Sequence, residues 1–440
     1  MGDEQDRLAT WGEIAKFLNC NVRTAQRWAN ERGLPVRRVP GGQKSSVFAY
    51  RRELQEWLDR DRTPPMPTPP GPRFPITRRG AIAMASVGAA ITGSAVWAWR
   101  RKPRDVTRAA LVGNTLVAWD AMGGMLWNHP FSETFDPQQP PPPPRNPLVC
   151  DLLSEGNNQV LFIGRFLEPD GLTPRCELFC FSSQGQMLWH YRPQLSLTFG
   201  NQPFSGPWTI EDIMFLNSPK GPRIWVALSH VTWRPGALVS IDALGRHSLQ
   251  FASCGNIYVL SQMANANGQY ILAGGINNEY NAAALAVVRA EGPPSSSPQT
   301  KGTLYECVNG PSGKPELYFL FPPTELNSAD GKPYNEILRV LGGSNGVDVR
   351  TQEAGRFRVQ SLAEAMYAIS PSLEVQNVAF DNNFAVQHRR FEQAGLLKHS
   401  LAACPLLNGP SRIRRWDAAS GWTDVEVPMK SGVRPESYSG

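Results

Sequence analysis

Hydrophobic and polar positions follow three different patterns along the 440-residue chain. Between residues 11 and 32 the apolar side chains recur with the spacing of an amphipathic helix. Residues 80–99 hold no charged side chain, and from about residue 105 the apolar positions form short runs between turns rich in glycine and aspartate. These patterns predict a multidomain protein with a small α+β domain at 8–62, one apolar helix, and a large all-β domain at 105–430.

The N-terminal domain is predicted to begin with a capping box. Thr10 and Glu13 have the spacing at which each side chain accepts a backbone N–H of the other residue. A turn at 19–21 and a helix-ending glycine at Gly33 enclose a second helix. The expected elements are a helix at 11–18, a helix at 22–32, a hairpin with strands 36–39 and 46–50 around Gly41-Gly42, and a helix at 50–59.

Two of these elements have polar and basic outer faces. In the second helix Val22, Ala25 and Trp28 face inward, so a polar face is left near its N-terminus. That face carries Arg23, Thr24, Gln26 and Arg27, and the hairpin carries Arg37, Arg38 and Lys44. The helix residues are placed to contact base edges and the hairpin residues to contact phosphates. Two other interpretations stay open, a solvated helix face and a domain that binds protein.

The order of these motifs resembles a known family. The string W-G-E-I-A-K-F-L…R-T-A-Q-R-W…G-L-P-V-R-R-V…V-F-A-Y…L-Q-E-W-L is similar to the MerR/excisionase-like winged helix-turn-helix domains over about 50 residues. In that family the second helix enters the major groove, so the resemblance implies this role for the four polar helix residues. Double-stranded DNA is then the expected partner, and binding should weaken steeply with salt.

A tether and an apolar segment follow the N-terminal domain. The basic linker at 63–79 has seven prolines between Thr63 and Pro75, a density that favours extended polyproline II. Residues 80–99 have the length of a transmembrane helix, with two tryptophans and Arg100-Arg101-Lys102 as an interfacial anchor. The alternative is a soluble, buried, alanine-rich helix. Small residues at every fourth position, Ala81, Ala85, Ala89 and Gly93, would allow two such helices to form a homodimer.

The long C-terminal region repeats one hairpin phrase. Residues 119–127, 181–189 and 241–249 align without gaps, and 416–422 is a fourth copy with one extra residue. Each copy predicts two strands around an Asp/Gly turn. Repeats about 60 residues apart indicate stacked or radial units. We expect a β-propeller of five to seven blades, with a pair of β-sandwiches as the alternative.

The repeats also carry resemblances. The hairpin phrase looks like a quinoprotein-type propeller repeat, and loops such as Asp151–Gly156 look like degenerate FG-GAP repeats, whose aspartates hold calcium. Here Leu153 stands where a carboxylate is expected, and only Asp151 and Glu155 remain, too few oxygen ligands for a calcium ion. The resemblances therefore imply a propeller without a bound ion.

Catalytic motifs are missing from the sequence. No Gly-x-Ser-x-Gly, phosphate-binding glycine loop or kinase signature is present. The six histidines show no metal-binding spacing, and Cys176 and Cys180 lie four apart on an expected strand, about 13 Å from each other. We assign no catalytic residue, no metal ligand and no cofactor, and we expect no enzyme activity. Six cysteines follow the apolar segment, an even number that permits disulfides in an oxidising compartment.

These expectations combine into one hypothesis. The formal net charge is only +6, and five basic residues flank each end of the apolar segment, so charge does not set its orientation. A DNA-binding domain must stay in the cytoplasm, which would place the propeller outside. We therefore predict a single-pass inner-membrane transcriptional regulator whose propeller binds an unknown ligand or protein. The alternatives are a scaffold protein that the N-terminal domain only tethers, and a soluble DNA-associated protein.

Overall fold

The computed structural model describes two parts of the chain. The first part comprises residues 6–8, 10–18, 22, 25, 29, 34–38 and 47–54, and the second runs from 105 to 430 with gaps at 134, 137–144, 169–172, 233–234, 344–345 and 355–361. The chain divides into two compact units, Met1–Trp99 and Arg100–Gly440, and each is described by itself.

The N-terminal unit contains one complete described helix and a small sheet. Helix α1 (Trp11–Phe17) begins at Thr10, whose hydroxyl accepts the backbone N–H of Glu13 at 3.2 Å, so the predicted first helix is present. Three antiparallel strands lie in the order β1 (Arg7–Leu8), β3 (Val47–Tyr50), β2 (Arg37–Arg38). Fully buried side chains of Ile14, Ala49 and Leu54 join the helix to the sheet.

The predicted winged helix-turn-helix fold is not supported by these elements. Most of the second helix and the tip of the hairpin lie outside the described residues. Of the second helix the structure describes Val22, Ala25 and Ala29, which are helical, and Ala25 is fully buried. The described residues therefore establish a three-stranded sheet with a capped helix, and not the complete motif.

The predicted membrane topology also needs correction. No helix in the described parts of the chain is both long and apolar enough to cross a membrane. Among the described helices the longest, α6 (Asn382–Gln393), has 12 residues, whereas a span needs about 20. The expected transmembrane segment at 80–99 lies outside the described residues. The single-pass inner-membrane localisation depended on such a helix and is not upheld.

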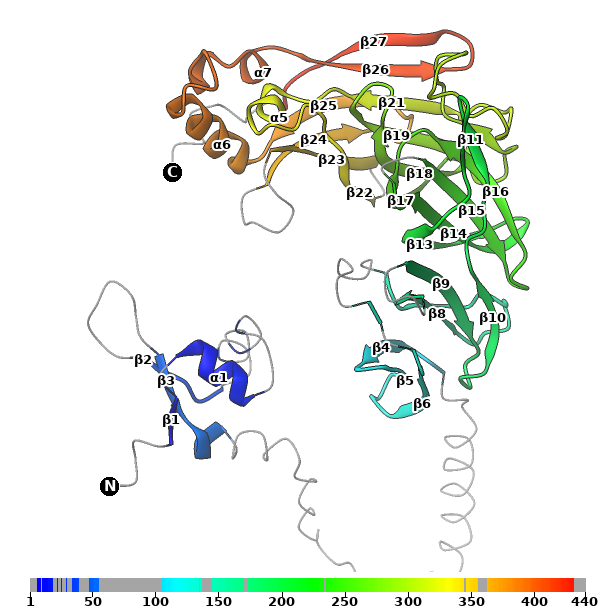
Figure 1. Cartoon of the computed structure of the whole chain (residues 1–440), viewed down its shortest axis with the longest axis vertical. Coiled ribbons are helices and arrows are strands. Elements are labelled where there is room, and N and C mark those ends of the chain that lie inside the picture. Colours follow the sequence, from blue (N-terminus) through cyan, green and yellow to red (C-terminus); the bar gives the residue numbers. More distant parts are fainter. Residues whose placement is uncertain are drawn as a thin grey trace, which may run out of the picture. The chain divides into compact units, whose positions relative to one another are not determined.

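The described residues of the C-terminal unit form five main antiparallel sheets (Figure 1), so the prediction of a large all-β domain is confirmed. The first three contain, in chain order, β4 (Arg108–Val112), β5 (Thr115–Trp119) and β6 (Met125–Pro130); β7 (Leu148–Cys150), β8 (Gln159–Leu167), β9 (Pro174–Phe181) and β10 (Met187–Tyr191); and β13 (Trp208–Ser218), β14 (Gly221–His230), β15 (Gly236–Asp242) and β16 (His247–Ser253). A short strand, β20 (Ser295–Ser296), pairs in parallel with β16. A separate hairpin joins β11 (Leu197–Phe199) to β12 (Gln202–Phe204).

The last two sheets are interleaved along the chain. The fourth sheet has the order β17 (Ile257–Asn265), β18 (Gly268–Asn277), β19 (Ala282–Arg289), β21 (Leu317–Phe321), β26 (Ser411–Asp417), β27 (Gly421–Val427). The fifth sheet contains β22 (Ile337–Gly343), β23 (Gly346–Ala354), β24 (Ala363–Ile369) and β25 (Val375–Phe380). The chain therefore leaves the fourth sheet after β21, completes the fifth, and returns to add two strands to the fourth.

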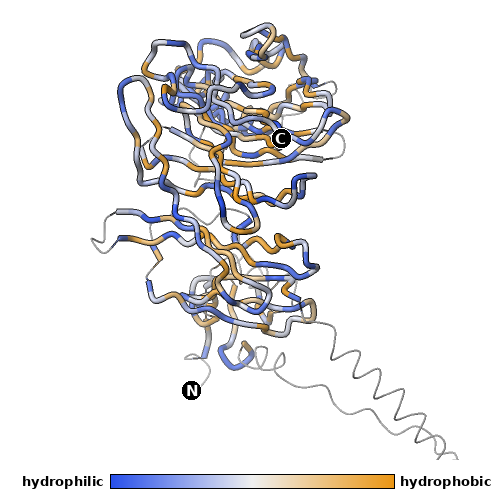
Figure 2. The backbone as a smooth tube through the Cα atoms, turned by 90° about the vertical axis from the view of Figure 1, so that its right-hand side faces the viewer, coloured by the Kyte–Doolittle hydropathy of each residue, from blue (hydrophilic) through white to orange (hydrophobic). Residues whose placement is uncertain are grey.

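The first strands of the five sheets lie side by side. Contacts join β4 to β7, β7 to β13, β13 to β17 and β17 to β22, the neighbour relations that the inner strands of propeller blades have. Hydrophobic residues run through the sheets, and hydrophilic residues gather in the connecting loops (Figure 2). The core accordingly lies between sheets that face one another.

The repeated hairpins have one common turn. At Asp242 the carboxylate accepts the backbone N–H groups of Leu244 and Arg246, both at 3.0 Å, and Asp120 and Ser182 make the corresponding bonds in their own turns. In the copy with one extra residue the Asp417 carboxylate accepts the N–H groups two and three residues later. A fifth copy occurs at Ser370, where Leu373 takes the positive φ, 67°, that glycine has in three of the other turns. This copy escapes the sequence pattern because a leucine stands at the glycine position.

These turns also pack neighbouring sheets together. Trp127 lies against Gly185 of the next hairpin, and Trp189 lies against Gly245 of the one after it. The indole N–H of Trp189 donates to the carbonyl of Ala243 at 3.2 Å. Trp127 and Trp189, which end the first two copies, therefore each contact the turn of the following copy, so this part of the sequence phrase encodes a contact between sheets.

Two crossovers between the fourth and fifth sheets carry the helices of the C-terminal unit. The outgoing crossover holds α5 (Glu325–Ala329), and the returning one holds α6, a 3-10 turn η1 (Leu401–Ala403) and α7 (Pro405–Asn408). Contacts join α5 to α6, α6 to η1 and η1 to α7, and Figure 1 shows the three helices at one end of the two sheets. Polar side chains from both crossovers meet there.

Candidate metal centre

Four side chains with metal-binding atoms converge where the two crossovers meet. Glu325 is the first residue of α5, and His388 lies in α6. His399 follows in the loop after α6, and Cys404 directly precedes α7. One ligand atom from each residue lies within 4.8 Å of the other three.

The separations have the size that a tetrahedral ion requires. The Oε1 atom of Glu325 lies 3.0 Å from Nε2 of His399, 3.6 Å from Nε2 of His388 and 3.5 Å from Sγ of Cys404. The two Nε2 atoms are 3.3 Å apart. A tetrahedral zinc ion with bonds of about 2.0–2.3 Å separates its ligand atoms by about 3.3–3.8 Å. The four atoms therefore need only small shifts to surround one ion.

Helix α6 places His388 through its own periodicity. The helix begins at Asp381, whose carboxylate accepts the backbone N–H of Phe384 at 2.9 Å. Phe384 and Phe391 are buried, and His388 lies between them at helical spacings of four and three residues. The same periodicity that buries the phenylalanines therefore turns the imidazole inward, where it is fully buried.

The environment of His388 favours the neutral form that binds metals. Burial lowers the pKa of its imidazole, which outweighs the effect of the nearby Glu325 carboxylate. Its Nδ1 atom has no hydrogen-bond partner and lies 3.9 Å from Oε2 of Glu392, one helical turn later. Glu392 also accepts the backbone N–H of Leu401 at 3.2 Å. Metal-binding histidines are commonly oriented by such a carboxylate at the second nitrogen.

The Cys404 thiol is buried at the start of α7. Burial raises its pKa to about 11, whereas backbone N–H groups of Leu407 and Leu406 lower it. The thiol is therefore protonated when no cation is near, and these N–H groups are placed to stabilise a thiolate once a metal ion has displaced the proton.

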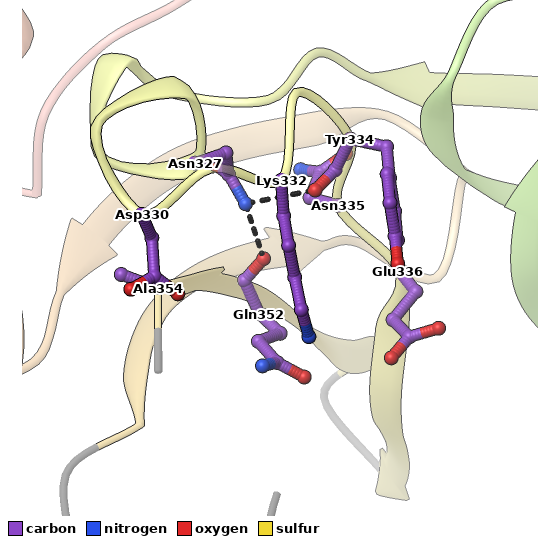
Figure 3. Close-up of a pocket in the computed structure, with 8 residues that line it drawn as sticks. All are labelled: Asn327, Asp330, Lys332, Tyr334, Asn335, Glu336, Gln352 and Ala354. Carbon is purple, nitrogen blue, oxygen red and sulfur yellow. Dashed lines mark hydrogen bonds between the residues drawn. The ribbon is translucent and has the colours of Figure 1, made fainter. Parts of the chain in front are cut away.

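A second group of residues holds α5 in place from the other side. Figure 3 shows a small pocket there, in which the Asn327 amide donates to the carbonyls of Tyr334 and Gln352 at 3.0 and 3.2 Å. The fully buried Glu353 carboxylate accepts the backbone N–H of Thr324, the N-cap of α5, at 2.9 Å. Buried hydrogen bonds to β23 and to the loop before β22 therefore position the residue next to Glu325.

The residues predicted to contact DNA belong to the N-terminal unit. Arg23, Thr24, Gln26, Arg27 and Lys44 lie outside the described residues. Arg37 is described, and it forms a bidentate ion pair with Glu53, with both N–O distances 2.9 Å. Arg38 lies in β2 opposite Val47. The Arg37 guanidinium is thus paired within the protein, which the sequence alone did not indicate.

The other candidate residues of the sequence analysis have structural roles. Cys176 and Cys180 are buried in β9, and no disulfide joins any of the six cysteines that the structure describes in the C-terminal unit. The Asp151 carboxylate accepts the backbone N–H groups of Glu155 and Gly156, both at 3.0 Å, so this loop closes on its own backbone.

No metal ligand was predicted from the sequence, and the positions of the four converging residues along the chain explain why. His388, His399 and Cys404 have spacings of eleven and five residues, which match no compact motif, and Glu325 lies 63 residues before His388. A search for histidines and cysteines within one short helical insertion would have found three of the four. Glu325 is brought to them by the path of the chain.

Comparisons with known proteins give no family. No family model and no curated protein matches the chain, so neither the winged helix-turn-helix nor the propeller-repeat resemblance has family support. The chain is similar to the solved structure of a glycosyl hydrolase from Bacteroides ovatus, with 9% identity, 66% of this chain and 85% of the other covered, and a TM-score of 0.29. It is also similar to the WD40 domain of SCAP from fission yeast, with 10% identity, 62% and 64% coverage, and a TM-score of 0.25.

One of these findings corrects the sequence analysis. We expected no enzyme activity, but the first of the two similar structures is an enzyme, and the expectation is withdrawn. A TM-score of 0.29 carries no argument about the activity of this chain. Within the described residues, the four converging side chains are the structural observation that bears on function.

Proposed function

We propose that the C-terminal unit binds one zinc ion through Glu325, His388, His399 and Cys404. The convergence of these four ligand atoms within 4.8 Å carries the proposal. Full burial of His388 and its lowered pKa support it, because a neutral buried imidazole is the form that binds a metal ion.

The mixture of donor atoms selects the kind of ion. Two imidazole nitrogens, one thiolate and one carboxylate oxygen suit zinc, whereas magnesium and calcium favour oxygen ligands alone. Four protein ligands complete a tetrahedral shell, which is the arrangement of a structural rather than a catalytic zinc site. The side chains of Glu325 and His399 are 30% and 25% exposed, so the ion can enter from solvent on their side.

Metal content of the full-length protein tests this proposal. Protein stripped with a chelator, supplied with zinc and freed of excess metal should retain one zinc per chain by elemental analysis. Cobalt in place of zinc should give the intense charge-transfer absorption of a thiolate ligand. Cys404→Ser should abolish that absorption. His388→Ala should lower the zinc affinity at least tenfold, because the loss of a group that only orients a metal ligand already costs about 10–100-fold.

Matched variants separate this site from other cysteines and histidines. Cys307 and His247 lie outside the cluster, so Cys307→Ser and His247→Ala should leave both the zinc content and the cobalt spectrum unchanged. If Cys404→Ser and His388→Ala both retain zinc with the affinity of the unaltered protein, the ion binds elsewhere and the proposal is wrong.

DNA binding by the N-terminal unit is a second candidate function, for which the sequence supplies the observation. Residues 1–62 hold twelve basic against nine acidic side chains, with Arg23 and Arg27 on the expected outer face of one helix. In a titration with duplex DNA, full-length protein should bind more weakly as salt rises, and Arg23→Ala with Arg27→Ala should reduce the salt dependence. Equal binding at low and high salt would exclude phosphate contacts. Arg37→Ala should have the smaller effect because Glu53 already pairs with Arg37.

A further inference from the structure

The segment between α6 and α7 makes its backbone hydrogen bonds to neighbouring helices, whereas its polar contacts with α5 come from side chains. Residues 393–396 and Lys398 are exposed. The backbone N–H groups of Gly395 and Leu396 donate to carbonyls of Glu392 and Phe391, and that of Leu401 to the Glu392 side chain. These three bonds end on α6, and at the other end of the segment the carbonyls of Ala402 and Cys404 accept bonds from the Asn408 amide of α7. The backbone of the segment is therefore bonded to the two helices that flank it.

The bonds from this segment to the other crossover are made by prospective metal ligands. His399 reaches Glu325 of α5 through the 3.0 Å contact, and the Cys404 thiol reaches the same carboxylate at 3.5 Å. Leu401 is buried in the hydrophobic core that the fourth and fifth sheets share, and the partly buried Leu397 packs against that core. These two leucines add apolar contacts to the polar ones. The polar attachment to α5 thus depends on the same side chains that would bind zinc.

We propose that zinc acts as a latch that fastens residues 394–404 to α5. This inference rests on the proposed zinc site and concerns what the ion does there. Glu325 comes from the crossover between β21 and β22, and the other three ligands come from the crossover between β25 and β26. One ion therefore links two crossovers that 63 residues separate along the chain, counted from Glu325 to His388.

The physical basis is the coupling of metal binding to local folding. Where the ligands do not all face the ion before binding, the free energy of binding is also free energy of local ordering. An exposed segment with few bonds beyond its two flanking helices opens at low cost when the ion is removed. Zinc should close residues 394–404 against α5, and its removal should let them open while the sheets stay folded.

The chain contains a convenient reporter of this opening. Lys398 is exposed and immediately precedes His399, so trypsin cleaves at this position only when the segment opens enough to enter the protease. Lys301 is also exposed and lies in another loop of the same unit, so cleavage after Lys301 serves as the internal control. Both cleavages can be followed by mass spectrometry in one digest of the full-length protein.

The expected result is selective protection by zinc. Saturating zinc should slow cleavage after Lys398 at least about tenfold relative to chelator-treated protein, and it should leave cleavage after Lys301 unchanged. In His399→Ala, cleavage after Lys398 should be fast with or without zinc. Glu325→Gln should give an intermediate rate, because the amide oxygen is a weaker ligand than a carboxylate.

The possible failures can be told apart. If the protein retains one zinc per chain but cleaves after Lys398 at the same rate with and without it, the latch is wrong and the zinc site stands. If the protein retains no zinc, the proposed function and the latch are both wrong. If zinc slows cleavage after Lys301 as strongly as after Lys398, the ion stabilises the whole unit and the local latch is excluded.

Discussion

Replacing Gly245 by alanine tests whether the repeated hairpins hold neighbouring sheets together. Gly245 has φ near +80°, and a Cβ atom there would lie 2.8 Å from Cγ and 3.1 Å from Cβ of Trp189. Gly123 occupies the same place in the first hairpin, also with φ near +80°, but a Cβ atom there would meet nothing within 4 Å. Gly123→Ala is therefore a matched control that carries the backbone cost without the contact between sheets.

The two costs can be estimated separately. A positive φ at a residue with a Cβ atom costs about 1–2 kcal/mol, and this cost applies to both variants. Overpacking against the indole adds about 1–3 kcal/mol for Gly245→Ala alone, because Trp189 is held by its own hydrogen bond to Ala243. We expect losses of about 2–5 kcal/mol for Gly245→Ala and about 1–2 kcal/mol for Gly123→Ala.

Urea denaturation followed by tryptophan fluorescence measures both losses in the full-length protein. The double variant Gly245→Ala with Trp189→Ala should lose less than the sum of the single variants, because the clash disappears with the indole. Equal losses for Gly245→Ala and Gly123→Ala, together with additivity in the double variant, would refute the role of Trp189 in joining the sheets.

Three further predictions follow from buried polar groups and from one strained turn. Burial raises the pKa of Glu353 above its usual value of 4.5, so its contribution to stability is present below pH 4.5 and is lost as pH rises through the higher folded-state pKa. Chemical denaturation at several pH values should show that Glu353→Gln loses less stability than the unaltered protein as pH rises above 4.5. Equal pH dependence of the two proteins would contradict this reasoning. Arg145→Ala should cost about 2 kcal/mol in a urea titration, since it leaves the 5%-exposed Asp212 carboxylate without its ion pair. Arg412→Ala, which breaks an exposed pair, should change the stability by less than about 0.5 kcal/mol, and similar losses for the two would contradict the role of burial. Leu373 has φ of 67°, so by thermal denaturation Leu373→Gly should be as stable as Leu373→Ala or more so, and a clearly weaker glycine variant would show that the turn is unstrained.

Features encoded within a few neighbouring residues were predictable. The Thr10 cap of α1 and the turn at Asp242 depend on side chains that bond to backbone N–H groups two to four residues away, so their sequence patterns are sufficient. The corresponding turn at Ser370 escaped the pattern because Leu373 adopts the positive φ that usually requires glycine. A local rule fails where the surrounding structure supplies the strain energy.

Features that depend on the path of the chain were not predictable. The sequence indicated many hairpins, but not that β26 and β27 would return to the fourth sheet after the fifth was complete. That return creates the second crossover and brings α6 beside α5. The pairing of Arg37 with Glu53, 16 residues away, likewise depends on how strand and helix pack.

The capped first helix, the large all-β domain and the repeated turns that begin at Asp120, Ser182, Asp242 and Asp417 all follow from sequence patterns. The meeting of Glu325 with His388, His399 and Cys404 follows from the tertiary fold and from no sequence pattern. The difference comes from how far apart along the chain the interacting residues lie. Turns and caps are stabilised by bonds within a few residues, whereas a four-ligand site needs side chains from two crossovers, and the packing of the sheets alone places these within one coordination sphere.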